Sequence, residues 1–166
     1  MLRIAAILTL PMVWAVIAAQ AADLDIEIRG IKTRTGHVNA ALFSNPEDFS
    51  LDIAFRAMIT REGDISTGVF TSEEHMPRPP VERGSTPANA RVVHLHMADL
   101  EPGTYALALY QDVNDDGKLA TDMRGRPLEP WGMSNNARVI DQKAPTFADA
   151  QFVLPPEGTR IVIDLQ

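Results

Sequence analysis

The sequence predicts an all-β protein: a single antiparallel β-sandwich of immunoglobulin-like or transthyretin-like type, with about seven short strands. Apolar and polar residues alternate in several short segments, which is the pattern of half-buried strands. Clusters of glycine, proline and asparagine separate these segments, as turns and loops do. We find no internal repeat and no sign of a second folded domain.

The first part of the domain contains two strands that we expect to pair. Apolar and charged residues alternate over residues 24–29, and the alternation resumes over residues 38–43. Residues 33–36 between them have the composition of a turn, so a hairpin is expected. Residues 45–49 are expected to form a loop that starts a helical turn. Residues 54–60 fit a short strand or a helix, which the periodicity does not distinguish.

The centre of the chain combines an irregular connection with two strands. Residues 75–89 include four prolines and Gly84, which predicts a long connection without regular structure. Residues 91–97 alternate as a strand does, and residues 101–103 are expected to form a tight turn. Residues 104–111 are apolar on both faces, which is typical of a central strand.

The C-terminal part is expected to close the domain. Residues 124–145 are rich in glycine and proline and are expected to be irregular, and residues 146–150 are expected to form one helical turn. Residues 151–154 and 160–165 have the pattern of strands, with a turn at Glu157-Gly158 between them.

The N-terminus has the three parts of a secretory signal peptide. A short basic start is followed by an apolar run over residues 4–18 and by the small-x-small site Ala19-Gln20-Ala21. We expect residues 1–21 to be removed and residues 22–166 to form the β-sandwich domain. The alternative is a membrane anchor, but the apolar run is at or below the ~17–20 residues that a span needs.

Charge and cysteine content restrict the partners and the compartment. The net charge is -7 and becomes -8 once Arg3 is removed, because 14 basic residues then face 22 acidic ones. An acidic surface argues against nucleic acid and anionic lipid as partners. The chain has no cysteine, which excludes thiol chemistry and cysteine-ligated zinc. These features fit a bacterial periplasmic or extracellular protein without stable membrane insertion after cleavage.

An acidic loop after residues 104–111 has the spacing of a calcium-binding loop. Oxygen-bearing side chains occupy its first, third and fifth positions, and Gly117 follows at the sixth. The twelfth position, usually a bidentate carboxylate, is Met123, and an aspartate lies one residue earlier. The expected metal ligands are Asp112, Asn114, Asp116, Lys118 through its carbonyl, and Asp122. The alternative is a turn in which these side chains cap backbone amides.

Two further groups of residues are candidates for binding. The segment around residues 131–138 offers an aromatic face beside short polar side chains, and its candidate ligand-binding residues are Trp131, Ser134, Asn135, Asn136 and Arg138. The alternative is an ordered loop whose asparagines bind backbone groups. His94 and His96 lie on one face of a strand and could bind zinc or copper with further ligands such as His37 or His75, or else form a solvated polar face.

Four segments form a recognisable set: LEPGTYALALYQD at 100–112, NDDGKL at 114–119, GRPLEPWGMSNNA at 125–137 and PTFADA at 145–150. Together they resemble a family of secreted bacterial proteins known as domain of unknown function 2141, over roughly residues 23–166. The resemblance implies a β-sandwich, secretion and no established activity. The chain departs from the family pattern at Gln111, where histidine is expected, and at Ala120, where an acidic residue is common.

These observations favour a secreted, non-catalytic binding or accessory module of unknown ligand, with calcium as the expected cofactor in a structural role. The expected partner is an envelope protein or carbohydrate. The first alternative is a structural or envelope-interaction domain without a ligand. The second is a hydrolase acting on carbohydrate or peptide. A hydrolase would need Trp131, Asn135 and Arg138 to converge with an acid, and we expect no catalytic residue because Ser134 lacks a nucleophile motif.

Overall fold

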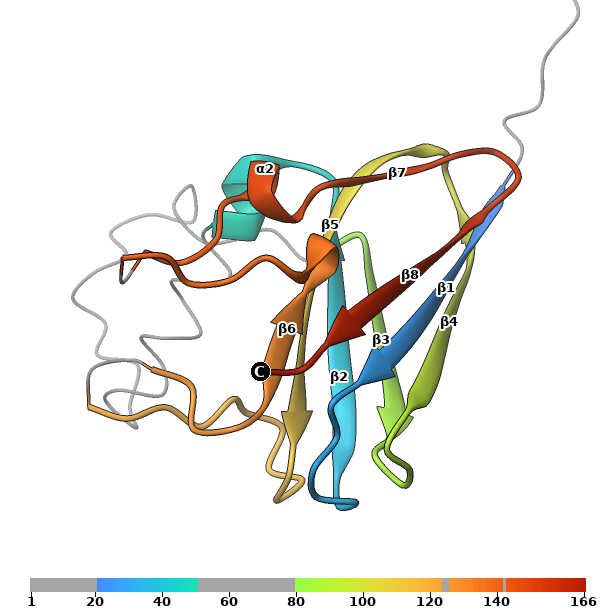
Figure 1. Ribbon diagram of the computed structural model, residues 1–166. Coiled ribbons are helices and arrows are strands. Elements are labelled where there is room, and N and C mark those ends of the chain that lie inside the picture. Colours follow the sequence, from blue (N-terminus) through green and yellow to red (C-terminus); the bar gives the residue numbers. More distant parts are fainter. Residues whose placement is uncertain (1–20, 51–79, 124–125, 142) are drawn as a thin grey trace, which may run out of the picture.

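The computed structural model describes residues 21–50, 80–123, 126–141 and 143–166. Two β-sheets lie face to face and form a β-sandwich (Figure 1), which confirms the predicted fold class. Three predictions fall outside the described residues: the signal peptide apart from Ala21, the strand or helix at residues 54–60, and His75 as a metal partner. The described part has no helix of the length and apolar content required to span a membrane.

The first sheet has three strands in the order β4-β1-β8. They are β4 (Val93–Leu100), β1 (Ala22–Arg29) and β8 (Thr159–Asp164). The central strand β1 runs antiparallel to β4 and parallel to β8. Its residues Leu24, Ile26 and Ile28 are at most 1 % exposed, while the charged residues between them face solvent, as the alternation predicts.

The second sheet has five strands, all paired antiparallel. Four follow one another in the order β3 (Glu82–Pro87), β2 (His37–Phe43), β5 (Gly103–Asp112) and β6 (Trp131–Met133), and β7 (Phe152–Leu154) pairs with the start of β5. Strand β5 has partners on both edges and buried residues on both faces, which confirms the predicted central strand.

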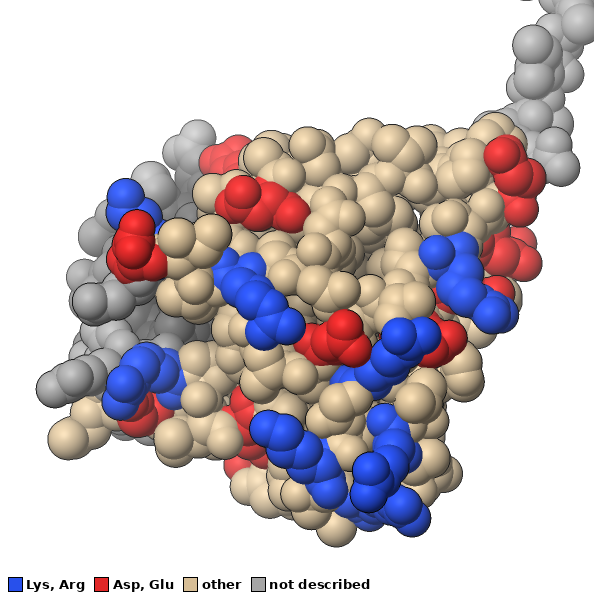
Figure 2. Space-filling view, viewed as in Figure 1, with Lys and Arg blue, Asp and Glu red and all other residues tan. Residues whose placement is uncertain are grey.

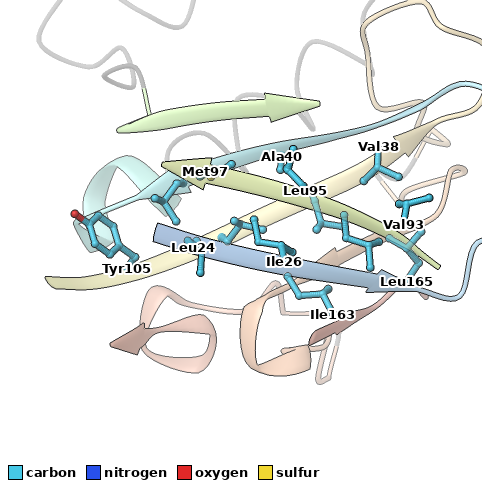
Figure 3. Close-up of a cluster of buried hydrophobic side chains, with 14 of the residues drawn as sticks. Leu24, Ile26, Val38, Ala40, Val93, Leu95, Met97, Tyr105, Ile163 and Leu165 are labelled. Atoms are coloured by element: carbon cyan, nitrogen blue, oxygen red, sulfur yellow. The ribbon is translucent and has the colours of Figure 1, made fainter. Parts of the chain in front are cut away.

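The inward faces of the two sheets form the main core (Figure 3). Leu24 and Ile26 of β1 lie in one buried cluster with Leu95 of β4 and with Val38 and Ala40 of β2. Burying a leucine or isoleucine side chain contributes about 1.5–3 kcal/mol relative to leaving it exposed. This core therefore holds the sheets together and fixes the ends of the strands from which the loops emerge.

A smaller core covers the outer face of the second sheet. Phe49 packs edge-to-face against Phe43 of β2, with ring centroids 5.6 Å apart, and against Phe147, with centroids 6.0 Å apart. Phe49 belongs to a helical segment that begins at residue 46, and Phe147 belongs to α2 (Phe147–Ala150). The predicted helical turn at residues 146–150 is confirmed, and a capping box between Thr146 and Asp149 starts it.

The predicted hairpin between residues 24–29 and 38–43 is wrong, because β1 and β2 lie in different sheets. Both edges of β1 are occupied, by β4 and by β8, so no edge is free for β2. Residues 30–36 instead carry the chain from one sheet to the other. Gly30 begins this connection with φ +82°, and a Cβ there would lie 2.9 Å from the carbonyl oxygen of Leu165, so the position requires glycine.

Two segments that were expected to be irregular contain strands. Residues 75–89 include β3, an edge strand with no buried residue, so no apolar alternation marks it in the sequence. Its last residue, Pro87, is tolerated because an edge strand need not donate every amide. Residues 124–145 include β6, which has only three residues, and the 3-10 helix η2 (Ser134–Asn136). The described part thus has eight strands rather than about seven.

Candidate functional site at the loop end of the sandwich

Three connections meet at one end of the sandwich, which we call the loop end: residues 30–36, residues 88–92, and residues 113–130 apart from the two that are not described. The strand register places them together, because His37 at the start of β2 pairs with Pro87 at the end of β3 and with Asp112 at the end of β5. Figure 1 shows these connections below β1, β3 and β5. Loops that emerge from a rigid scaffold are a common place for binding.

The buried side chain of Gln111 fixes the first of these connections. Its Nε2 donates to the carbonyl oxygens of Thr33 at 2.7 Å and Thr35 at 2.9 Å. Gln111 is 0 % exposed, and its Oε1 has no hydrogen-bond partner among the residues that the structure describes. The amide of Ala88 donates to the carbonyl oxygen of Gly36 at 2.9 Å, which ties the second connection to the first.

The acidic loop is closed from inside by Asp112, which is 2 % exposed. Its Oδ1 accepts from the amide of Asp116 at 3.1 Å, and its Oδ2 accepts from the amide of Gly117 at 2.7 Å. Asp115 and Gly117 have φ of 57° and 78°, which lets the chain turn sharply between them. The hydrogen bond between His37 Nδ1 and Asp115 Oδ1, at 2.8 Å, joins the tip of the loop to β2.

The other predicted metal ligands also bind groups within the loop. Asp116 Oδ1 accepts from the amide of Lys118 at 2.8 Å, and Asp116 Oδ2 accepts from Asn114 Nδ2 at 2.9 Å. Asp122 accepts from the amide of Arg126 at 3.0 Å and forms an ion pair with its guanidinium. These contacts match the expected alternative of a capped turn.

Among the described residues, no group of three acidic or histidine side chains converges as a metal site would require. In the acidic loop, a calcium ion would have to share the carboxylate oxygens with the backbone amides that they already accept from. Calcium binding by Asp112, Asn114, Asp116, Lys118 and Asp122 stays a prediction.

Glu129 is a loop-end residue that the sequence analysis missed. Its Oε1 accepts from the amide of Val113 at 2.8 Å, and its Oε2 accepts from the amide of Ala120 at 2.9 Å. One carboxylate thus joins the two ends of the acidic loop. No spacing rule indicates this role, because Glu129 lies nine residues or more from both amides; only its position between two prolines marks it as part of an ordered connection.

The predicted ligand-binding residues bind the chain itself, as the ordered-loop alternative expects. Ser134 is 0 % exposed, accepts from the amide of Leu107 at 2.9 Å and donates to the carbonyl oxygen of Ala150. Asn135 Nδ2 donates to the carbonyl oxygen of Gln151 at 2.6 Å. Ser134 and Asn135 therefore hold β5 and the end of α2 against η2.

The rest of this segment attaches to the C-terminal strand. Asn136 Oδ1 accepts from the amide of Asp164 at 2.7 Å, and Arg138 Nη1 donates to Gln166 Oε1 at 3.0 Å. Trp131 is partly buried and packs against the smaller core. These contacts do not bring Asn135 and Arg138 to one point, since one binds Gln151 and the other Gln166.

The histidine pair lies on the exposed face of the first sheet. His96 Nδ1 lies 2.9 Å from Asp25 Oδ1 of the neighbouring strand, and this hydrogen bond raises the pKa of His96 above its ordinary value. His94 is also exposed and pairs in register with Glu27. His37, the possible partner, belongs to β2 in the other sheet and contacts Asp115.

Comparison with known proteins gives one match. The family model described as "Uncharacterized protein conserved in bacteria (DUF2141)" matches residues 53–162, which include the acidic loop and the segment at residues 131–138. No curated protein and no solved structure matches the chain.

Proposed function

This chain belongs to the bacterial family DUF2141, and we propose that it is a secreted, non-catalytic β-sandwich module that binds its ligand at the loop end. One observation carries the proposal: three connections from different parts of the chain are fixed to one another by contacts that leave many of their side chains free to face solvent. The proposed secretion rests on the signal peptide predicted at residues 1–21.

The contacts that fix the loop end come mainly from buried groups. Gln111 holds residues 33–35, Asp112 closes the acidic loop, and Glu129 joins its two ends. Exposed side chains on the same connections, such as Thr33 and Lys118, face solvent. A surface whose backbone is already ordered loses less conformational entropy when it binds, which favours affinity.

The two alternatives draw less support from the geometry. A hydrolase would need Trp131, Asn135 and Arg138 to converge, and their contacts lead to different elements. A ligand-free structural domain would not require solvent-facing residues on connections whose backbone is fixed by the contacts of Gln111, Asp112 and Glu129. The loop-end module is therefore the function that the geometry supports best.

Site-specific photo-crosslinking in the living bacterium tests the proposal. A photoreactive amino acid is introduced at the exposed loop-end positions Thr33, Asn89 or Lys118, and at Glu157, an exposed control position between β7 and β8 at the other end. We expect adducts from the loop-end positions and none from Glu157. Equal adducts from all positions, or none from any, would overturn the proposal.

A further inference from the structure

A basic pocket lies in the loop end, within a protein whose net charge is -7. Its volume is about 520 Å³, and it is lined by Gly30, Ile31, Lys32, Arg34 and Arg91. Figure 2 shows lysine and arginine side chains gathered at the lower end of the molecule, where Figure 1 places the β1–β2 and β3–β4 connections. Two separate connections thus bring three cations to one concave surface.

These three cations have no acidic partner among the described residues. Two other arginines provide a contrast: Arg29 pairs with Glu27 at 2.7 Å, and Arg126 pairs with Asp122 at 2.7 Å. Lys32, Arg34 and Arg91 are exposed and form no ion pair within the described part of the chain. Unneutralised charges of one sign around a pocket focus the electrostatic field and attract a ligand of the opposite sign.

The backbone that carries Lys32 and Arg34 is held in place on both sides. Ile31 is 4 % exposed and belongs to the main core, so it anchors the connection directly before Lys32. The carbonyl oxygens of Thr33 and Thr35, which flank Arg34, both accept from Gln111. Lys32 and Arg34 therefore alternate along the chain with residues that are attached to the sandwich, by core packing or by hydrogen bonds.

The connection that carries Arg91 is attached to the same unit. Ala88 is 1 % exposed, and its amide donates to Gly36 at 2.9 Å. Gly36 itself packs so tightly on β5 that a Cβ there would lie 1.8 Å from the carbonyl oxygen of Asp112. All three cations thus project from backbone whose position is set by buried contacts.

We propose that this pocket binds a phosphate group. Arginine guanidinium groups form paired hydrogen bonds with phosphate oxygens, and lysine adds a compact charge. Three cations match a phosphate dianion better than the single charge of a carboxylate. The inference rests on the proposed function, because it names the ligand chemistry of one part of the loop end. The phosphate belongs either to a small soluble molecule or to a lipid headgroup.

Two variants of equal charge test this inference. The pocket variant is K32Q/R34Q/R91Q, and the control variant is R83Q/K143Q/R160Q, which removes the same charge from exposed residues elsewhere. Thermal melting first shows that both variants are folded. Calorimetry at low salt then measures binding of inorganic phosphate and pyrophosphate, and sedimentation measures binding to vesicles of phosphatidylglycerol or phosphatidylcholine.

We expect the pocket variant to bind its phosphate probe at least about tenfold more weakly than the wild type, and the control variant to bind it unchanged. Binding of phosphate or pyrophosphate supports a soluble ligand, and binding of phosphatidylglycerol vesicles alone supports a lipid headgroup. Equal weakening in both variants, or no binding to any probe, overturns the phosphate site. The two proposals can fail separately. If the crosslinking experiment gives loop-end adducts but no phosphate probe binds, the phosphate site is overturned and the proposed binding module still stands.

Discussion

At the residue scale, single polar side chains join elements that are distant in the sequence. Ser134 connects η2 to β5 and to the end of α2, and Asn136 connects η2 to β8. Gln111 does the same between β5 and the β1–β2 connection. Each of these side chains satisfies backbone groups that lack a strand partner at that point. Their removal should therefore cost more than an ordinary surface hydrogen bond.

Ser134→Ala should destabilise the protein by about 1–3 kcal/mol, because it leaves the buried amide of Leu107 and the carbonyl of Ala150 without their partner. Urea denaturation monitored by circular dichroism measures the change. The control is Ser85→Ala on the exposed edge strand β3, which should change the stability by less than about 0.5 kcal/mol. Equal midpoints for wild type and Ser134→Ala would contradict the role of this hydroxyl.

Two glycines at the loop end both have positive φ but different surroundings. Gly36 has φ +69°, and a Cβ there would collide with Asp112. Gly117 has φ +78°, and a Cβ there would have no described atom beyond its chain neighbours within 4 Å. We expect Gly117→Ala to cost about 1–2 kcal/mol, from backbone strain alone. Gly36→Ala should cost clearly more, because the β1–β2 connection must also move away from β5. Denaturation midpoints of the two variants measure both losses of stability. Equal losses would contradict the close packing of Gly36 on β5.

The sequence identified the chemistry of these residues but not their partners. Ser134, Asn135 and Asn136 stand out in the sequence as a polar set, and the ordered-loop alternative expects Asn135 and Asn136 to bind backbone groups. Which backbone groups they bind depends on the strand register, since Ser134 and Leu107 are 27 residues apart. Glu129 was missed for the same reason, because its role exists only once β5 and β6 are paired.

At the scale of elements, local periodicity predicts strands that have one buried face, and pairing depends on the rest of the fold. Strands β1, β4 and β5 alternate or are apolar, and each was predicted close to its observed bounds. The edge strand β3 and the short strand β6 carry no such signal. The predicted hairpin was wrong because β2 could pair with β1 only along a free edge of β1. In the fold, β8 pairs along that edge, although β8 lies more than a hundred residues later in the sequence.

The cross-strand pair of His96 on β4 and Asp25 on β1 should make stability depend on pH. Their hydrogen bond raises the pKa of His96 above its ordinary value of 6.5 and lowers the pKa of Asp25 below its ordinary value of 3.8. The His96 contribution is complete below its unfolded pKa and is lost as the pH rises through its higher folded pKa. The Asp25 contribution is lost only as the pH falls through its folded pKa, below 3.8.

His96→Gln should therefore lower the melting temperature near about pH 5.5, and the difference from the wild type should fade towards about pH 9. Differential scanning calorimetry across this range measures it. His94→Gln is the matched control, because it removes an exposed imidazole from the same face of the same strand. A difference for His96→Gln that is constant with pH would contradict the charged pair.

The acidic loop provides a test of calcium at the same scale. Asp112 and Glu129 hold the loop through four backbone amides. If the loop also binds calcium, as its spacing predicts, the melting temperature should be higher in millimolar calcium than in chelator. A site filled at 100 times its dissociation constant would add about 2.7 kcal/mol. An unchanged melting temperature over millimolar calcium would contradict the calcium site.

At the scale of the whole molecule, net charge and local charge differ in sign. The chain carries -7 overall, which favours solubility and argues against long-range attraction to polyanions. The basic pocket is a local exception, formed because the fold brings residues 32, 34 and 91 together. Composition predicts the average surface but not such a cluster, since its members come from two connections that only the sandwich places side by side.

The predicted signal peptide gives a whole-molecule prediction. Strand β1 begins at Ala22, which is 2 % exposed, so the sandwich starts directly after the expected cleavage site. Expressed from its own start in a bacterium, the protein should leave the cytoplasm and have the intact mass of residues 22–166. Replacing both Ala19 and Ala21 with leucine should block cleavage, because the peptidase requires small residues there.

Ala15→Leu, within the apolar run, is the matched control and should be processed normally. Cell fractionation and mass spectrometry of the three proteins give the answer. A wild-type product that keeps Met1 in the cytoplasm would contradict secretion. In that case envelope molecules would no longer be candidate partners. Binding at the loop end would then be tested with phosphate compounds of the cytoplasm.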